Sequence, residues 1–180
     1  MSKSVLISIQ PYWFFLIIAE SMGWYIGKVK TEEIRKNFPK DSDWDRIAII
    51  YCSKDKKSFN RIPKEYQPLM QKFLGKVVGK WFCDSIEMVN AKCSAYGIDL
   101  FYHDCMTQGC LTEREIDKYF NIPEDKDLRV MKGNGYAWHI SNLKIYDKPK
   151  ELSEFFTPMG KRPSYMIERP PQSWCYVEAD

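Results

Sequence analysis

The chain has 180 residues, which is enough for one well-filled core, and its hydrophobic share of 44% excludes a disordered or low-complexity protein. The net charge of +3 is too small to imply nucleic-acid binding by itself. Six irregularly spaced cysteines favour a reducing cytoplasm over a disulfide framework. The apolar run from Tyr12 to Ala19 is too short to span a bilayer, so we expect a cytoplasmic protein with no membrane partner.

The chain begins with a predicted strand and a predicted apolar helix. Val5 to Ile9 is rich in strand-forming residues. Pro11 then suits the first turn of a helix, which we expect to continue from Tyr12 to about Ile26. This helix is apolar almost all round, which indicates burial on more than one side. Gly27 can end it.

A charged stretch follows, and Thr31 to Lys36 is predicted to be a strand. Alternation along a strand places Glu33 and Arg35 on one face, while Ile34 on the other face points to the core. Lys30, just before the strand, can reach the same groove, so that a carboxylate between two cations could orient a polar ligand. The alternative is a solvated strand of paired charges, each pair contributing roughly 0–1 kcal/mol to stability.

Further elements are predicted along the rest of the chain. Gly79 within one predicted strand indicates a bulge or a close backbone approach. The remaining strands are expected at 46–52, 76–84, 135–147 and 173–178, with short helices at 66–73 and 149–156.

Thr112 carries two signals for the start of a helix. Thr112 and Glu115 have the spacing of a capping box, and Leu111 with Ile116 has that of a hydrophobic staple. The helix should end by Phe120 to Asn121.

The order of these elements does not alternate between strand and helix, which argues against a doubly wound sheet. It favours an α+β fold, a mixed β-barrel flanked by helices. We expect one domain over residues 1–180, with a less regular insertion around 88–110.

Several stretches resemble the ASCH family of the PUA-like superfamily. The family hallmark is a glycine, a lysine two residues on, an acidic or hydroxyl residue three beyond that, and an arginine two further. Lys30, Glu33 and Arg35 match the last three positions, whereas the glycine position holds Lys28, one residue after Gly27. The stretches at 8–11 and 30–39 carry this match, and those at 50–54, 75–79, 135–141 and 169–176 resemble small ASCH-like proteins of bacterial prophages and mobile elements. The resemblance implies a PUA-like, partly open mixed β-barrel with a cleft beside the first helix.

The resemblance also implies a partner, which would be RNA, DNA or a modified nucleoside. The ligand-binding residues would be Lys30, Glu33 and Arg35, with an aromatic platform for a base. Candidates for that platform are Trp138, Tyr136 and Trp174, in the matching stretches, and Trp13, two residues after the stretch 8–11. The alternative is that these aromatic residues belong to the core.

Catalysis is a second possibility. One ASCH branch hydrolyses N4-acetylcytidine with a lysine, a threonine three residues later and a distant glutamate. Lys30 matches the lysine, but Glu33 stands at the threonine position and Thr107 at the glutamate position. If the chain is an enzyme, either an amidohydrolase or a ribonuclease, Lys30 and Glu33 would be its catalytic residues. A weaker alternative is a phage protein that binds a host protein; the oligomeric state is left open.

No cofactor or metal is expected. The spacing of Cys93, His103, Cys105 and Cys110 fits no zinc finger or ribbon. His139, between apolar neighbours on a predicted strand, is interpreted as a hydrogen-bonded structural histidine.

Overall fold

The computed structural model describes residues 2–40, 42, 44–89, 105–122, 135–160 and 163–179. Its strands are β1 Lys3–Ile9, β2 Glu32–Arg35, β3 Trp44–Cys52, β4 Lys76–Phe82, β5 Ile86–Val89, β6 Gly135–His139, β7 Ser141–Lys150 and β8 Trp174–Glu178. Its helices are α1 Pro11–Ile18, α2 Lys56–Phe59, α3 Gln67–Met70 and α5 Glu113–Phe120, with 3-10 turns η1 Gln71–Phe73 and η3 Leu152–Glu154.

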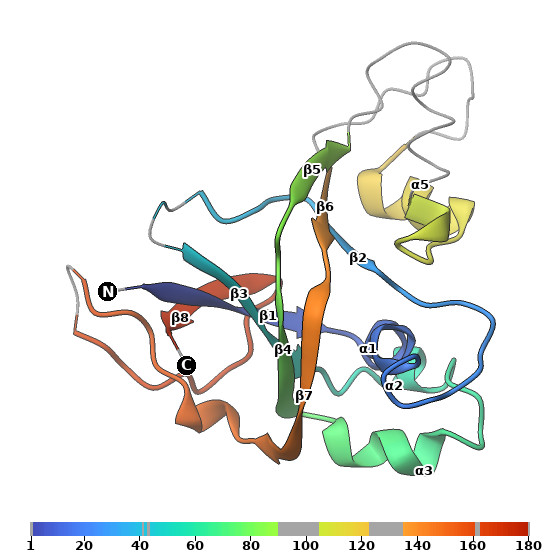
Figure 1. Ribbon diagram of the computed structural model, residues 1–180, viewed down its shortest axis with the longest axis horizontal. Helices are drawn as coiled ribbons and strands as arrows, with labels where there is room; N and C mark the ends of the chain where they lie inside the picture. Colours follow the sequence, from blue (N-terminus) through green and yellow to red (C-terminus); the bar gives the residue numbers. More distant parts are fainter. Residues whose placement is uncertain are drawn as a thin grey trace.

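The strands form two sheets (Figure 1). A five-stranded sheet has the order β7-β4-β3-β1-β8, and a three-stranded sheet has the order β2-β6-β5. Within the described residues these sheets do not close into a barrel. The α+β class is confirmed, and the expected barrel is an open pair of sheets.

The five-stranded sheet is buried on both faces. β1 pairs parallel with β3 and antiparallel with β8, so it lies inside the sheet. Ile7 and Ile50 join the core cluster that includes α1, whereas Leu6 and Ile49 join a second cluster with Ile167. Burial on both faces explains why β1 and β3 are near-continuous apolar runs in the sequence.

Helix α1 is shorter than predicted, because it ends at Ile18 instead of continuing to about Ile26. The hydroxyl of Ser21 donates to the carbonyl oxygen of Ile18 at 2.8 Å, and Gly23 has the left-handed φ of 67° that a helix cannot continue through. Nowhere in the described ranges is a helix both long and apolar enough to cross a membrane.

Gly79 in β4 shows both predicted features, an irregular strand register and a close backbone approach. The β3–β4 register slips there, since Ile50 faces Gly79 while Tyr51 faces Val77. A Cβ atom on Gly79 would lie 2.5 Å from the carbonyl oxygen of Lys144, so the backbones of β4 and β7 approach too closely for a side chain.

The single strand expected from Gly135 to Asp147 is in fact two strands that belong to different sheets. β6 leads into β7 through Ile140, just as β4 leads into β5, and the two ribbons run side by side (Figure 1). β2 pairs with the free edge of β6 and is thereby held against the rest of the fold. The predicted helix at 149–156 is also wrong, because the ladder to β4 extends to Lys150 and leaves only the short turn η3.

Helix α5 begins and ends as predicted. The Thr112 hydroxyl accepts a hydrogen bond from the Glu115 amide at 3.3 Å, and Glu115 accepts one from the Thr112 amide at 2.9 Å. Asn121 follows the last turn in the left-handed conformation. The irregular insertion expected at 88–110 lies largely outside the described residues.

Replacing Thr112 with alanine should lower the free energy of unfolding by about 1 kcal/mol, because the first turn of α5 loses its side-chain acceptor. Thr112→Gly should cost less, and Thr112→Ser should retain most of the stability. Urea denaturation of the three variants measures the difference. Equal stability of the alanine and serine variants would contradict the cap.

Candidate functional site

A cavity of about 800 Å³ lies where the carboxyl end of β1 meets α1, β2 and α5. This volume lies within the range of small-molecule sites. The view in Figure 1 shows β2 passing between α1 and α5. Segments far apart in the sequence line the cavity: Ser8, Ile9, Gln10, Trp13, Lys30, Glu33, Ile34, Arg35, Lys36, Ser53, Asp55, Arg61, Leu111, Glu115, Lys118, Tyr119, Pro170, Pro171 and Gln172.

Glu33 lies between two cations on the β2 wall of this cavity. Its Oε1 is 2.9 Å from an Arg35 guanidinium nitrogen, and its Oε2 is 3.5 Å from Lys30 Nζ. Lys30 and Glu33 are only 3% and 7% exposed. Lys30 also donates to the carbonyl oxygen of Gly109 at 2.8 Å. These three side chains form a buried charged cluster, and below we call Lys30, Glu33 and Arg35 the charged floor.

Arg35 joins the two sheets. Its guanidinium donates to the backbone carbonyl of Ser8 at 2.6 Å, so a β2 side chain is bonded to β1. The Lys30 amide donates to the carbonyl oxygen of Leu16, which attaches the entrance of β2 to α1. The charged floor is therefore also a junction between elements that share no strand ladder.

The cavity wall carries polar groups without partners. Glu33 Oε2 is buried and has no hydrogen bond, only the longer contact to Lys30. The exposed side-chain amides of Gln10 and Gln172 have no hydrogen-bond partner in the described part of the chain. A carboxylate accepts hydrogen bonds, and an amide both donates and accepts them. The two exposed amides can therefore bind a ligand edge with both donors and acceptors, whereas Glu33 Oε2 is covered by the protein.

One side of the cavity is aromatic and cationic. The ring of half-buried Trp13 has Lys30 Nζ 5.5 Å and Arg61 Cζ 4.7 Å from its centroid. Arg61 lies 3.9 Å from the Tyr12 centroid and pairs with Glu115 of α5 at 2.7 Å. This ion pair joins the segment after α2 to α5.

The cavity is net positive. Its cations are Lys30, Arg35, Lys36, Arg61 and Lys118, and its anions are Glu33, Asp55 and Glu115, which gives five positive against three negative charges. Burial alone would raise the pKa of the Glu115 carboxyl, but hydrogen bonds from Thr112 and the Arg61 charge lower it below its usual value. Burial raises the pKa of Tyr119, so its hydroxyl is protonated at neutral pH. An anionic or polar ligand suits this charge balance.

The structure brings Trp13 together with the charged floor but separates two other predicted residues from it. Trp138 is 0% exposed and packs against Trp44 and Trp174 at centroid distances of 5.8 and 6.1 Å. The Trp174 indole donates to the Asn37 side chain at 2.8 Å. Neither Trp138 nor Trp174 lines the cavity, so their interpretation as a base platform is corrected to that of core packing.

Some cavity residues were not predicted. Gln10 and Gln172 lie in the stretches 8–11 and 169–176, whose resemblance to the family pointed to no amide. Arg61 and Tyr119 carry no local sequence signal for a site.

His139 lies elsewhere, with Nδ1 2.6 Å from a carboxylate oxygen of Asp84. This hydrogen bond lowers the pKa of Asp84. Cys93 and His103 fall outside the described residues. Among the residues that the structure describes, no group of three or more His, Cys, Asp and Glu side chains could hold a metal ion.

Comparison with known proteins defines the class of fold. No family model and no curated protein sequence matches the chain. Two crystal structures of the ASCH protein from Zymomonas mobilis do match it in fold. A serine-to-alanine variant has a TM-score of 0.56 at 16% identity, covering 97% of this chain and 88% of that one. A tyrosine-to-phenylalanine variant has a TM-score of 0.55 at 15% identity, with coverage of 97% and 90%.

The chain therefore shares the fold of these ASCH crystal structures. At these identities the likeness concerns the fold, and function is argued from the site itself.

Proposed function

We propose that the chain binds RNA, DNA or a modified nucleoside by taking a nucleobase into the cavity beside Trp13. The observation that carries this proposal is a single cavity in which the ion-paired Glu33 carboxylate, the half-buried Trp13 ring and the exposed amides of Gln10 and Gln172 lie together. A nucleobase presents N–H donors, ring acceptors and a flat apolar face in one ligand.

Each part of the ligand has a matching part of the cavity. The amides of Gln10 and Gln172 would donate to and accept from the polar edge of the base, next to the charged floor. Trp13 supplies a stacking face. Lys36 and Lys118 are exposed at the cavity rim, where they would attract phosphate groups.

Hydrolysis, either of an acetylated nucleoside or of RNA, has less support. Lys30 is held by Glu33 and by the Gly109 carbonyl, and the position three residues after it is an ion-paired carboxylate instead of a hydroxyl. A general base also works best when it is not already bound to cations. We therefore assign the charged floor to binding and orientation.

The test is a binding panel of nucleosides, modified nucleosides, nucleoside monophosphates and short single strands, measured by thermal shift and titration calorimetry. Trp13→Ala should weaken the best ligand by about 5-fold or more, because stacking contributes roughly 1–3 kcal/mol per base. Gln172→Ala should also weaken binding, because it removes an amide that faces the ligand. It should leave stability unchanged, since this exposed amide has no hydrogen-bond partner in the described chain.

Tyr25→Ala is the control, because Tyr25 is 98% exposed and does not line the cavity. Failure of every ligand to bind, or wild-type affinity in both the Trp13 and Gln172 variants, would overturn the proposal. Turnover detected by mass spectrometry would favour the hydrolase instead.

A further inference from the structure

A second hollow of about 550 Å³ lies against the turn that closes the cavity. Below we call it the side groove; it is lined by Thr157, Tyr165, Met166, Ile167, Glu168, Arg169, Pro171 and Cys175. Pro171 lines both the side groove and the cavity, so one proline separates the two spaces. The two spaces are therefore neighbours, on either side of this residue.

The partition at Pro171 is fixed to the sheet. The Ser8 hydroxyl donates to the Pro171 carbonyl oxygen at 2.6 Å, and the Ser8 amide donates to the Ser173 carbonyl oxygen at 2.9 Å. Ser8 itself belongs to β1 and lines the cavity. The position of Pro171 between the cavity and the side groove is thus fixed by one residue of the central sheet.

The far wall of the side groove is also anchored. The Thr157 amide donates to the Tyr165 carbonyl oxygen at 2.9 Å, and the Tyr165 amide donates to the Thr157 hydroxyl at 3.1 Å. Ile167, two residues on, is 6% exposed and belongs to the core cluster under the five-stranded sheet. Tyr165 is consequently displayed from a hydrogen-bonded hairpin.

The side chains of the side groove have the chemistry of a nucleotide site. Tyr165 is 59% exposed and Met166 is 43% exposed, so both offer apolar surface to a ligand in the side groove. Arg169 is exposed beside them and has no ion pair or hydrogen bond in the described part of the chain. An aromatic ring next to a guanidinium is the combination that binds single strands, by stacking and by phosphate contact.

We propose that the side groove is a second nucleotide subsite, in which the neighbour of the base in the cavity stacks on Tyr165 while Arg169 contacts a phosphate. This inference rests on the proposed function and narrows it from a free nucleoside to a single-stranded oligonucleotide. A nucleoside bound in the cavity leaves the Tyr165 face unused, whereas a strand that extends across Pro171 places its next nucleotide in the side groove.

The test compares ligands of two lengths on the full chain by titration calorimetry. The short probes are the four nucleoside 5′-monophosphates, and the long probes are random-sequence RNA and DNA hexamers. Hexamers should bind more tightly than monophosphates. Tyr165→Ala should weaken hexamer binding by about 5-fold or more and leave monophosphate binding unchanged. Tyr25→Ala is the matched control, since it removes an exposed tyrosine outside both spaces.

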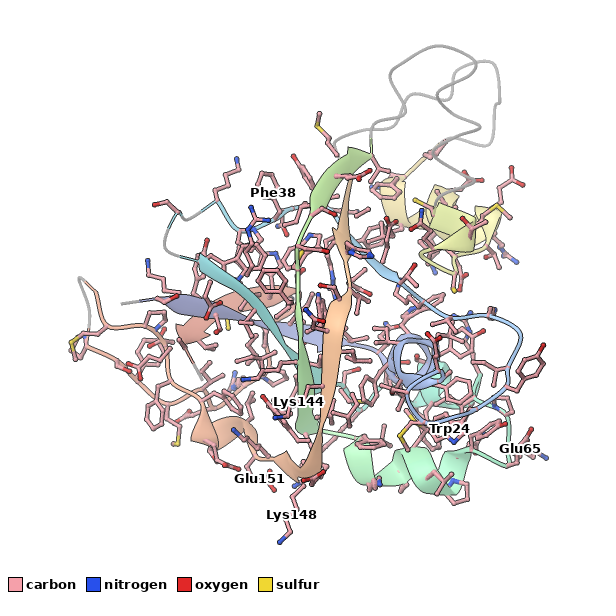
Figure 2. The ribbon with its side chains drawn as sticks, viewed as in Figure 1. Trp24, Phe38, Glu65, Lys144, Lys148 and Glu151 are labelled. Atoms are coloured by element: carbon pink, nitrogen blue, oxygen red, sulfur yellow. The ribbon has the colours of Figure 1, made fainter. Side chains whose placement is uncertain are left out.

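Arg169 has an independent readout. Arg169→Gln should reduce the slope of log affinity against log salt by about 0.7 for a hexamer, which corresponds to one lost phosphate contact. Lys148→Gln is the control, because the Lys148 side chain projects away from the fold at the end of β7 (Figure 2). Circular dichroism and melting temperature confirm that each variant is folded.

The outcomes separate the two proposals. Monophosphate binding in the cavity, with hexamers no tighter and Tyr165→Ala without effect, overturns the side groove alone. A loss that is equal for both probe lengths also overturns it, because Tyr165 would then act through the shape of the cavity. Failure of both probe types to bind the wild-type chain, when the nucleoside panel does find a ligand, overturns the side groove alone, and failure of the whole panel overturns both proposals.

Discussion

Replacing Glu33 with glutamine is expected to lower the free energy of unfolding by roughly 3–5 kcal/mol, because it leaves two buried cations without their carboxylate. For a chain of this length, the melting temperature should fall by roughly 6–20 °C. The neutral amide preserves the size of the side chain, so the loss of stability reflects the missing charge and not a gap in the packing. Lys30 cannot reach solvent without breaking its bond to the Gly109 carbonyl.

Urea denaturation of Glu33→Gln beside Glu87→Gln measures this effect. Glu87 is an exposed carboxylate on β5, and its substitution should change stability by less than about 0.5 kcal/mol. A loss for Glu33→Gln below about 1 kcal/mol would mean that the charged floor behaves as an exposed ion pair.

The structure thereby corrects an expectation drawn from the sequence. The alternative given above was a solvated strand, on which the pairs around Glu33 would contribute little to stability. Both partners are instead largely buried, with the Arg35 side chain only 11% exposed. Reduced ligand binding in Lys30→Ala or Arg35→Ala would therefore combine lost contact with lost structure, so the rim residues are better probes of function.

The second large effect is expected at Trp138. Trp138→Ala should cost roughly 3–5 kcal/mol, because it empties a fully buried site between Trp44 and Trp174. Trp13→Ala should cost less, since Trp13 is only half-buried, yet it should have the greater effect on ligand binding. The Trp138 variant thus tests the packing of the core, and the Trp13 variant tests ligand binding in the cavity.

Chemical denaturation and ligand titration on the same two variants provide the comparison. A folded Trp138→Ala variant with normal stability and lost binding would restore Trp138 to the ligand site. Trp138→Phe is the intermediate control, because it keeps an aromatic ring and most of the buried apolar surface.

Much of the fold was predictable because its signals are local. The apolar runs of β1 and β3, the glycine in β4 and the capping box of α5 each depend on a few adjacent residues. The division of one predicted strand into β6 and β7 was not predictable in this way. Strand alternation continues through Ile140, and only the partner strand changes, from β5 to β4. The early end of α1 required Ser21 and Gly23 to outweigh an apolar pattern that continues to Ile26.

The candidate site was also predictable only where its signals are local. Alternation along β2 was enough to put Glu33 and Arg35 on one face. Their burial depends on distant backbone carbonyls, from Ser8 for Arg35 and from Gly109 for Lys30, which no local pattern reveals. The same holds for Arg61, whose place on the Trp13 ring depends on the position of α5.

The bond from Arg35 to the Ser8 carbonyl has a consequence for how such a protein can change its specificity. Because the charged floor fastens one sheet to the other, mutations there are penalised whether or not a ligand matters. The side-chain amides of Gln10 and Gln172 on the cavity wall make no hydrogen bond in the described chain. Substituting them should therefore change the stability little. Divergence towards new ligands, in nature or in a directed library, should therefore accumulate at these amides while the floor stays constant.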